Sequence, residues 1–545
     1  MSPRVRSLPL VLLVLAAAAA HAQSPLREKW IYCAQNLMVD KNVDTTEALF
    51  QRAAKAGYTH VLLADYKLNI LDQMDAHYFR NVDRVKRVAQ ETKLEVVPAV
   101  FPIGYSNGLL NHDPNLAEGM PVRDALFTVK NGVASLTADP AVSLKGSDFA
   151  DFKGWTMHDS SISLDAGVAR MTDPKGANAR LMQPVQTSPF RQYHLSVEVK
   201  TQDLTGAMPE VEFLGKGGAR LCFSNLGVKR TQDWKLCHAV FNSLENTEVK
   251  VYLGCWGAKT GIVEWRHPKL EEIGLVNLVR RAGAPFEVKT EDGRVLTEGK
   301  DYEPVSDPRL GITPYRGEYD IYHEPPVIRT KLPDGTRLRV SYYHTVTVYD
   351  GQVNICPSEP KTLELLRDQA KRVHALWGTK GYFMSHDEIR VLNWDKSCAD
   401  RHLDAGPLLA DNVKTCADIL REINPGGKIY VWSDMFDPNH NAKKDYFLVK
   451  GDLTGSWLGL SKDIRVMLWH YDQRANSLKF FAGLGNPMLI AGYYDAAPAK
   501  VRDWLDAAKP YPGVEGVMYT TWENNYRDLE KFSTEIKDWE SGQTK

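Results

Sequence analysis

The feature that most constrains the fold is a regular alternation of short apolar runs with amphipathic helical segments, found at both ends of the chain. The first alternating part covers residues 30–101, and the second begins at Pro357. Strands that alternate with helical patterns of about 10–15 residues indicate βαβ units and a parallel sheet. We predict eight strands, three in the first part and five in the second, at residues 30–33, 61–64, 94–101, 382–385, 429–433, 465–469, 488–491 and 514–521.

Helices are predicted between these strands from apolar residues that recur every three or four positions. The segment 77–92 places Tyr78, Val82, Val85 and Ala89 on one stripe, as expected for a helix that covers a parallel sheet. Eight strand–helix units favour a TIM (β/α)8 barrel. The predicted helices lie at residues 45–56, 77–92, 362–377, 408–423, 499–509 and 527–539.

The pattern changes between the two halves. From about residue 129 to 344 the chain has short alternating runs separated by Gly, Asp and Pro turns, which is typical of all-β structure. Residues 155–274 have the length of a β-sandwich, and residues 286–344 form a further small β unit. We therefore predict an α/β protein, a TIM barrel with an all-β, sandwich-like domain inserted between strands three and four. The predicted parts are residues 23–128, 129–345 and 346–545.

The N-terminal residues 1–22 have the pattern of a cleavable signal peptide. Arg4 and Arg6 precede an apolar stretch from Leu8 to Ala20, and Ala20-His21-Ala22 has the small-x-small form of a cleavage site. No cysteine follows closely enough for lipid anchoring, and no later segment approaches the roughly 20 apolar residues that a membrane span needs. We expect a soluble, secreted or periplasmic protein without membrane insertion.

Charge and cysteine content narrow the possible partners. The chain has 67 basic and 68 acidic residues, a net charge of -1, which gives no electrostatic reason to expect nucleic acid or an anionic membrane as partner. A neutral ligand such as an oligosaccharide or glycoconjugate fits this balance. The seven cysteines show no Cys-x-x-Cys spacing, and the histidines show no His-x-x-x-His spacing. We therefore expect no structural zinc, no other metal and no cofactor.

Two neighbouring acids stand where the fourth strand opens into a loop. His386-Asp387-Glu388 ends the apolar run of residues 381–385. In a (β/α)8 barrel the loops after the C-terminal strand ends form the active face. Carboxyl groups at this position therefore indicate acid–base catalysis.

The ends of the other C-terminal strands are aromatic and acidic. Flat aromatic rings match the C–H faces of a pyranose and carboxylates accept its hydroxyls, so this composition favours a neutral sugar. Several candidates also have a structural interpretation. A Trp at a strand end more often packs in the core, and His386 is explained by a structural hydrogen bond at least as well as by contact with substrate. Asp434 and Asp495 could equally cap the loops that follow them. The candidates are Trp394, Trp432, Asp434, Trp469, Tyr493, Asp495, Trp522 and Glu523.

These motifs resemble glycoside hydrolase family 20, the β-N-acetylhexosaminidases. The family motif His-x-Gly-Gly-Asp-Glu lines up with residues 383–388, and Trp394 follows it as a Trp does in the family. Tyr493-Tyr494-Asp495 matches the family's Tyr-x-Asp, and Trp522-Glu523 matches its Trp-Glu. Trp432 and Trp469 match its strand-end tryptophans.

The resemblance implies a role for each candidate. Glu388 is expected to protonate the leaving oxygen, and Asp387 to orient the 2-acetamido group whose oxygen attacks C1. Tyr493 is expected to hold that oxygen. Glu523 is expected to bind sugar hydroxyls, and Trp432, Trp469 and Trp522 to wall the pocket. Such substrate-assisted retaining enzymes need no nucleophile of their own. One acid must stay protonated while its neighbour is ionised, and adjacent like charges in a partly dry pocket separate two pKa values in this way.

The sequence departs from the family at three places. Residues 30–36 lack the sugar-binding arginine of the first strand, Pro102-Ile-Gly104-Tyr105 replaces Pro-Gly-His, and Ser385-His386 replaces the glycine pair. The large β insertion is also unusual. The resemblance covers residues 30–127 and 346–540 through short motifs only, and indicates a distant relative.

Two other functions are compatible with the sequence. The first is a two-carboxylate glycosidase that pairs Glu388 with Asp434 on the neighbouring strand and needs no acetamido group. The second is a non-catalytic carbohydrate-binding protein whose sandwich presents Trp234, Trp256 and Trp265, although such residues are more often core. The sequence leaves open the sugar, the linkage, exo or endo cleavage and the role of the insertion.

Overall fold

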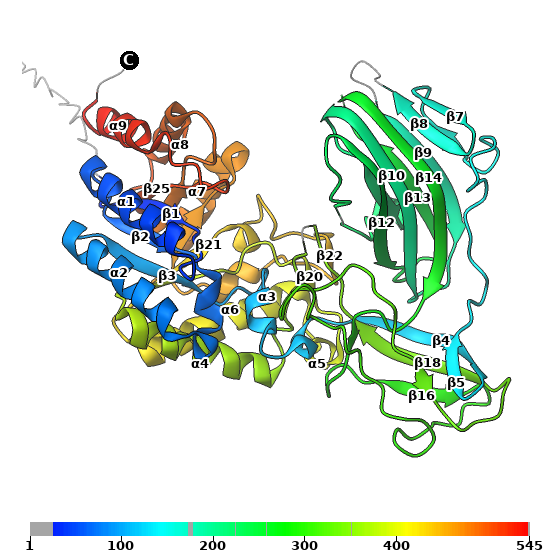
Figure 1. The fold of residues 1–545 in the computed structure, drawn as a ribbon. Coiled ribbons are helices and arrows are strands. Elements are labelled where there is room, and N and C mark those ends of the chain that lie inside the picture. The colour runs from blue at the N-terminus through cyan, green and yellow to red at the C-terminus, as the bar shows by residue number, and fades with distance from the viewer. Residues whose placement is uncertain (1–25, 173–177, 224, 258, 350, 543–545) are drawn as a thin grey trace, which may run out of the picture.

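The computed structural model describes residues 26–172, 178–223, 225–257, 259–349 and 351–542. The predicted signal peptide, residues 1–22, lies outside these ranges. Figure 1 shows a barrel covered by helices and an all-β part that extends from one side of it. Within the described ranges, no helix has the length and apolar character required to cross a bilayer.

The eight predicted strands form a closed parallel barrel, which confirms the predicted fold class. Their order around the barrel follows the chain, and the last strand pairs with the first through Glu28–Gly516 and the following residues. The strands are β1 (Glu28–Cys33), β2 (His60–Leu63), β3 (Glu95–Val100), β19 (Gly381–Met384), β21 (Lys428–Trp432), β23 (Arg465–Leu468), β24 (Met488–Ala491) and β25 (Val514–Tyr519).

Side chains alternate between the two faces of each strand. Those that point inward, such as Trp30, Phe383 and Met518, fill the barrel interior as one apolar cluster. Those that point outward, such as Ile31 and Met384, belong to a second cluster beneath the helices. Because both faces are apolar, the strands read in the sequence as continuous hydrophobic runs, as is typical of buried parallel strands.

The helices begin and end at residues that favour their termini. The side chain of Asp75 caps α2, and Gly57 ends α1 with a φ of 95°, a left-handed conformation that suits glycine. The helices that cover the barrel are α1 (Asp40–Ala56), α2 (Ala76–Thr92), α4 (Pro360–Trp377), α6 (Ala405–Ile423), α7 (Arg474–Leu484), α8 (Val501–Ala508) and α9 (Leu529–Glu540), with two one-turn helices, α3 (Asn107–Leu110) and α5 (Lys396–Ala399), in loops.

One connection differs from the predicted helices, and a second departs from a regular strand–helix unit. The sequence does not predict α7, because its apolar residues do not fall on one face. Between β21 and β23 the described residues 433–464 contain 3₁₀ turns and no α-helix. The short strand β22 (Leu448–Val449) in this connection pairs in parallel with β20 (Val391–Leu392). Two loops at the C-terminal face of the barrel are thereby tied together.

The insertion lies between β3 and β19, as predicted, and contains three sheets. Two pack as a sandwich: β12 (Gln232–Asn242), β10 (Gln192–Gly206), β14 (Lys259–Ile273), β8 (Val168–Thr172) and β7 (Ile162–Asp165) against β11 (Glu210–Leu214), β13 (Glu248–Cys255), β9 (Ala179–Gln186) and β6 (Met157–His158). The third contains β15 (Leu278–Val279), β18 (Arg337–His344), β4 (Met120–Lys130), β5 (Val133–Leu136), β17 (Ile328–Arg329) and β16 (Glu287–Thr290).

The third sheet joins segments from both ends of the insertion. β4 pairs antiparallel with β18 from Thr128–Arg337 to Met120–His344. The all-β structure therefore starts at Met120, earlier than the expected boundary between residues 128 and 129.

The three tryptophans that the sequence offers as a sugar platform do not form one. Trp265 is fully buried in the sandwich core. The ring of Trp234 is covered by the guanidinium of Arg266, 4.1 Å from its centroid. Trp256 lies beside Tyr252, with ring centroids 6.1 Å apart.

Candidate functional site

Three carboxyl groups meet at the C-terminal face of the barrel, in the loops after β19 and β21. The backbone N–H of Glu388 donates to Asp434 Oδ2 at 2.8 Å. Asn441 Nδ2 donates to the same oxygen at 3.0 Å, and Trp469 Nε1 donates to Asp434 Oδ1 at 3.3 Å. Asp434 is fully buried. Its carboxylate therefore anchors the loop that carries Asp387 and Glu388.

Glu388 has two side-chain partners. Its Oε2 accepts a hydrogen bond from the Tyr105 hydroxyl and lies 2.7 Å from an Arg390 guanidinium nitrogen. The side chain of Glu388 is 25% exposed, whereas that of Arg390 is only 8% exposed. The guanidinium gives the carboxylate a charged partner at the edge of the mouth, and Oε1 is the oxygen that remains to meet a ligand.

The backbone around the acids is closely packed against the loop after β3. A Cβ at Gly104 would lie 1.9 Å from the carbonyl oxygen of Asp387, so only glycine fits there. Gln352 Nε2 donates to the carbonyl oxygens of both Gly104 and Glu388, each at 2.8 Å. Glu388 itself has a φ of 49°. These contacts fix the direction in which the two acids project.

Burial and the repulsion between like charges favour protonated carboxyl groups in the cluster. Burial raises the pKa of Asp387 well above its usual range, and the charges of Asp434 and Glu388 add to this effect. Burial also raises the pKa of Asp434 to about 7, against the opposing effect of the hydrogen bond from the Glu388 N–H. Like charges confined in one pocket do not all ionise near neutral pH. In the free protein the environment therefore favours the protonated form of Asp387, whereas the resemblance assigns the proton to its neighbour.

Aromatic rings line the mouth beside these acids. Trp469 stacks on Tyr494, with centroids 5.9 Å apart and planes at 14°. The ring of Trp522 lies 5.7 Å from that of Trp432 and 5.1 Å from that of Tyr32. Trp522 and Tyr494 are 43% and 45% exposed, whereas Trp432 is 4% exposed and forms the floor. Burial, together with the charge of Asp387, raises the pKa of Tyr32.

Tyr493 lies away from the mouth, in contrast to the prediction. It is buried, stacks on Tyr519 at 4.0 Å, and its hydroxyl donates to Asp528 Oδ2 at 3.1 Å on the helix side of the barrel. The regular strand ends at Ala491, and the chain turns at Tyr494, which has a φ of 52°. The following tyrosine, Tyr494, is therefore the one that reaches the mouth.

His386 and Trp394 are also structural rather than substrate contacts. His386 is fully buried against α6, where its Nε2 lies 3.2 Å from Asn412 Oδ1. Its side chain points away from the barrel axis, as does that of Met384 two residues earlier. Burial lowers its pKa to about 4, so it is neutral. Trp394 donates through Nε1 to the Leu448 carbonyl oxygen at 2.6 Å and packs in a small apolar cluster under the insertion.

Asp495 and Glu523 differ in environment. Asp495 accepts from Thr521 Oγ1 at 2.6 Å and from the backbone N–H of Trp522 at 2.7 Å. It caps the loop after β25 and thereby positions Trp522, which is the alternative that the sequence left open. Glu523 is exposed on the rim beside Trp522.

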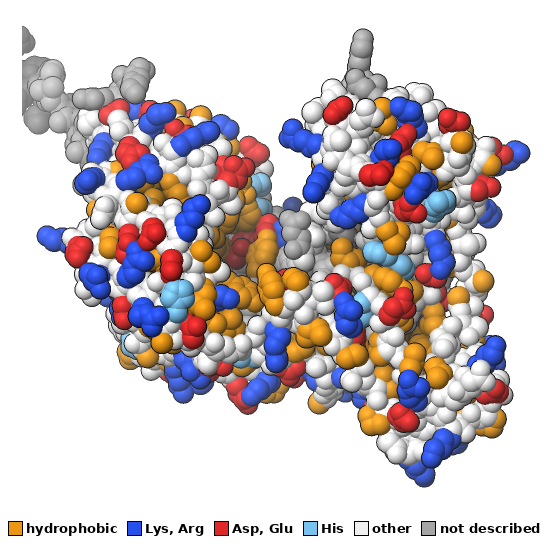
Figure 2. Space-filling model, in the orientation of Figure 1, with side chains coloured by type: hydrophobic (Ala, Val, Ile, Leu, Met, Phe, Trp, Pro, Cys, Tyr) orange, Lys and Arg blue, Asp and Glu red, His pale blue; other side chains and the backbone are white. Residues whose placement is uncertain are grey.

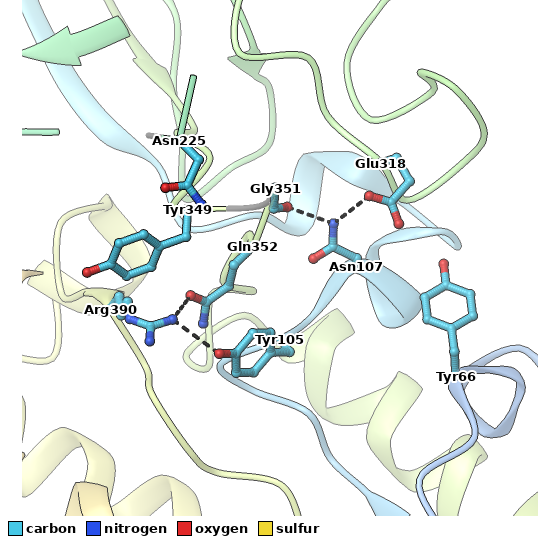
Figure 3. Close-up of a pocket in the computed structure, with 9 residues that line it drawn as sticks. All are labelled: Tyr66, Tyr105, Asn107, Asn225, Glu318, Tyr349, Gly351, Gln352 and Arg390. Atoms are coloured by element: carbon cyan, nitrogen blue, oxygen red, sulfur yellow. Dashed lines mark hydrogen bonds between the residues drawn. The ribbon is translucent and has the colours of Figure 1, made fainter. Parts of the chain in front are cut away.

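A cavity of about 510 Å³ opens next to Glu388, between the barrel and the insertion. Figure 2 shows the molecule hollowed between these parts, and Figure 3 shows the polar and aromatic side chains that converge there. The hydroxyl of Tyr66 is buried in the cavity wall without a hydrogen-bond partner in the described part of the chain. The cavity is lined by Tyr66, Tyr105, Asn107, Asn225, Glu318, Tyr349, Gly351, Gln352 and Arg390.

The sequence prediction missed several residues of the site. Tyr105 stands where the resemblance expects a histidine after the third strand, and this departure was itself a signal. Arg390 is the single charged residue in the run Ile389–Leu392, and a charge in an otherwise buried run often has a partner. Gln352, Tyr32 and Tyr494 carry no comparable sequence signal.

Metal-ligating side chains gather elsewhere. Among the described residues, the four that could together hold a metal ion lie where the insertion joins the barrel, and not at the mouth. They are Glu118, Cys356, Asp395 and Cys398.

No family model matches this sequence, and no curated protein matches it either. Solved structures similar to the fold include a chitobiase from Flavobacterium johnsoniae described as GH20, with 9% identity and a TM-score of 0.37 over 95% of this chain and 53% of that one. A rhamnosidase from Novosphingobium sp. PP1Y has 12% identity and a TM-score of 0.33 over 96% of this chain and 59% of that one.

A GH20 exo β-N-acetylglucosaminidase from Vibrio harveyi, an inactive mutant, has 8% identity and a TM-score of 0.28 over 67% of this chain and 93% of that one. This chain thus spans less than two thirds of the chitobiase and of the rhamnosidase. At these identities and TM-scores, the likenesses bear on neither substrate nor mechanism.

Proposed function

We propose that this protein is a glycoside hydrolase that cleaves its substrate at the mouth of the barrel. The observation that carries the proposal is the cluster of Asp387, Glu388 and Asp434 beside exposed aromatic rings. Glycoside hydrolysis needs neighbouring carboxyl groups that differ in protonation. Stacking on Trp522 and Tyr494 suits the C–H faces of a sugar. The signal-peptide pattern at residues 1–22 supports action outside the cytoplasm.

The mechanism we infer is substrate-assisted release of a terminal N-acetylhexosamine. Glu388 donates a proton to the glycosidic oxygen as the C1–O bond breaks, while the acetamido oxygen of the substrate bonds to C1. Asp387 accepts the acetamido N–H and stabilises the positive charge. Water then attacks C1 and displaces the acetamido oxygen, with Glu388 taking the proton from the water, so the anomeric configuration is retained. Tyr494 takes the place that the resemblance gave to Tyr493.

Substrate binding would move the proton to the residue that uses it. In the free protein the environment favours the proton on Asp387. An acetamido N–H that donates to Asp387 stabilises its ionised form, and the new negative charge attracts a proton to Glu388. A substrate without the acetamido group would leave the proton on Asp387. This gives a physical reason for the enzyme to prefer acetamido sugars.

The cavity beside Glu388 is suited to the group that leaves. It adjoins the Tyr105 hydroxyl and Arg390, which both contact Glu388. Asn107 and Asn225 place neutral side-chain amides in the cavity wall, as a second sugar requires. Because Asn225 belongs to the sandwich, the insertion would contribute to recognition of the leaving group.

A second candidate is a two-carboxylate glycosidase. It is favoured by the pKa of Asp434, which burial raises to about 7, and by the ion pair that gives Glu388 a cationic partner. In this mechanism Asp434 would supply the proton and Glu388 would act as the nucleophile. Such an enzyme would cleave sugars with a 2-hydroxyl as readily as acetamido sugars.

The test is hydrolysis of aryl β-N-acetylhexosaminides and plain aryl hexosides by the purified protein and by Glu388→Gln. Removal of a general acid lowers kcat by about 10²- to 10⁴-fold. The matched control is Glu364→Gln, at an exposed position on α4 where Glu364 pairs with Lys361. It should hydrolyse both substrates like the unmodified protein.

The outcomes separate the candidates. Activity confined to acetamido sugars, and lost in both Glu388→Gln and Asp387→Asn, supports the first mechanism. Equal activity on plain hexosides, lost in Asp434→Asn, supports the second. Unchanged hydrolysis by Glu388→Gln would exclude both mechanisms. If neither substrate class is hydrolysed but sugars bind to the sandwich, a non-catalytic carbohydrate-binding protein would be favoured.

A further inference from the structure

A buried cluster of four side chains lies where the insertion leaves the barrel and returns to it. Glu118 lies two residues before β4, and Cys356 lies four residues before α4. Asp395 and Cys398 lie in the loop that follows the acid pair, at the start and within α5. All four side chains are fully buried. Three segments that are far apart in the sequence therefore meet at one point.

The spacing of the four ligand atoms matches a tetrahedral site. A zinc ion with Zn–S bonds of about 2.3 Å and Zn–O bonds of about 2.0–2.2 Å places its sulfurs about 3.8 Å apart and each sulfur about 3.6 Å from an oxygen. The Sγ atoms of Cys356 and Cys398 are 3.6 Å apart. Cys398 Sγ is 3.6 Å from Glu118 Oε2, and Cys356 Sγ is 3.4 Å from Asp395 Oδ1.

Surrounding groups hold the carboxylates in this orientation. Glu118 Oε1 accepts from the backbone N–H of Trp394 at 2.7 Å and of Asp395 at 3.2 Å, so Oε2 is directed at the sulfurs. Asp395 Oδ1 accepts the backbone N–H of Cys398 at 3.0 Å, and Asp395 Oδ2 accepts from Arg281. Arg281 also pairs with Glu359 at 2.7 Å. Outer contacts of this kind orient the ligands of metal sites.

The charge of the cluster is incompletely balanced by protein groups. Glu118, Asp395 and Glu359 are buried, and Arg281 is the cation that contacts two of them. A buried carboxylate is costly unless it is paired or coordinates a metal. A cation bound among the four side chains would satisfy both carboxylates and both sulfurs.

We propose that Glu118, Cys356, Asp395 and Cys398 bind one zinc ion as a closed structural site. Thiolate ligands select zinc over magnesium and calcium, and four protein ligands leave no open position for a substrate. The ion fastens both ends of the insertion to the loop that follows Asp387 and Glu388. This inference is independent of the proposed function, because none of the four metal-binding residues lies at the mouth of the barrel.

The test is the metal content of the full-length protein purified without chelators. We expect inductively coupled plasma mass spectrometry to detect one zinc ion per chain. Replacement by Co²⁺ should give a thiolate-to-cobalt charge-transfer band in the near ultraviolet, together with d–d bands of tetrahedral intensity. Cys356→Ser and Cys398→Ser should each lower zinc occupancy at least tenfold. The matched control is Cys416→Ser, which removes a buried thiol in α6, and this variant should retain one zinc ion per chain.

A measurement on the unmodified protein covers the case in which the cysteine variants do not fold. Removal of zinc with dipicolinate should lower the midpoint of thermal unfolding, and added Zn²⁺ should restore it. Two results would overturn the proposal. One is protein without zinc that also gives no cobalt charge-transfer band. The other is a tryptic peptide pair linked through Cys356 and Cys398 under non-reducing conditions, because that covalent bond would remove both sulfur ligands.

Discussion

Tyr493 and Tyr494 offer a sharp test of the site, because the motif pointed to one and the structure places the other at the mouth. The same substitution, tyrosine to phenylalanine, removes one hydroxyl from each. In Tyr493→Phe the lost group is a donor to Asp528 on the helix side of the barrel. In Tyr494→Phe the lost group belongs to a ring that is 45% exposed beside Trp469 and Trp522.

The expected magnitudes follow from these environments. A typical side-chain hydrogen bond contributes about 0.5–1.5 kcal/mol to stability, so Tyr493→Phe should lower the free energy of unfolding by about 1 kcal/mol and leave kcat/KM unchanged. The Tyr494 hydroxyl would hold the acetamido oxygen in position to attack C1, and a misplacement of a reacting group by about 1 Å can cost about 10²-fold in rate. Tyr494→Phe should therefore lower kcat/KM about 10²-fold, with little change in stability.

The assay is hydrolysis of an aryl β-N-acetylhexosaminide together with urea unfolding of each variant. Tyr494→Phe keeps both ring contacts, with Trp469 at 5.9 Å and Trp522 at 5.8 Å, so a loss of activity reports on the hydroxyl alone. The reasoning is refuted if Tyr493→Phe loses activity while Tyr494→Phe remains fully active. That result would mean that the loop after β24 presents the other tyrosine to the sugar.

Two further predictions concern the charge at the mouth and the sandwich. Burial raises the pKa of Asp434 to about 7, so in the two-carboxylate mechanism, where Asp434 supplies the proton, kcat/KM should fall as the pH rises through this value, and Asp434→Asn should be inactive. Burial raises the pKa of Asp434 in the folded state above the ordinary value of 3.8, so protonated Asp434 contributes its full stabilisation of the fold below pH 3.8. This contribution is lost as the pH rises through about 7. Urea midpoints that fall equally in the unmodified protein and in Asp434→Asn between these pH values would contradict the prediction. Trp234→Ala should leave turnover of small aryl sugars within about twofold, since the ring packs under Arg266 on the sandwich, and a tenfold loss would place the sandwich in the chemistry.

The sequence predicts the barrel well because its strands are buried on both faces. Residues such as Phe383 and Met384 are apolar whether they point inward or outward, so each strand is a continuous run bounded by helices. The connection after β21 lacks this signal, because its fold depends on contacts with distant loops such as the pairing of β22 with β20. The start of the insertion at Met120 is hidden for a similar reason, since β4 acquires its sheet partner from residues 337–344.

The site is predicted less completely because motifs fix order along the chain but not direction in space. Asp387, Glu388, Asp434 and Trp522 reach the mouth as the strand count predicts. Trp394 follows the acids closely in sequence, but the loop carries it under the insertion. The ligands of the proposed zinc site come from three segments, and the close pair, Asp395 and Cys398, has the two-residue separation of a common zinc motif but an Asp in place of the first Cys.

The insertion is bound into the geometry of the acid pair and is not a separate module. Gln352, in the segment that returns from the insertion, holds the carbonyl oxygens of Gly104 and Glu388 at 2.8 Å each and accepts from Arg390. Arg390 in turn contacts Glu388. A displacement of the returning segment would therefore move both the backbone and the charged partner of Glu388. Because Cys356 follows Gln352 by four residues, fixing it in the proposed metal site would also limit the movement of the acid.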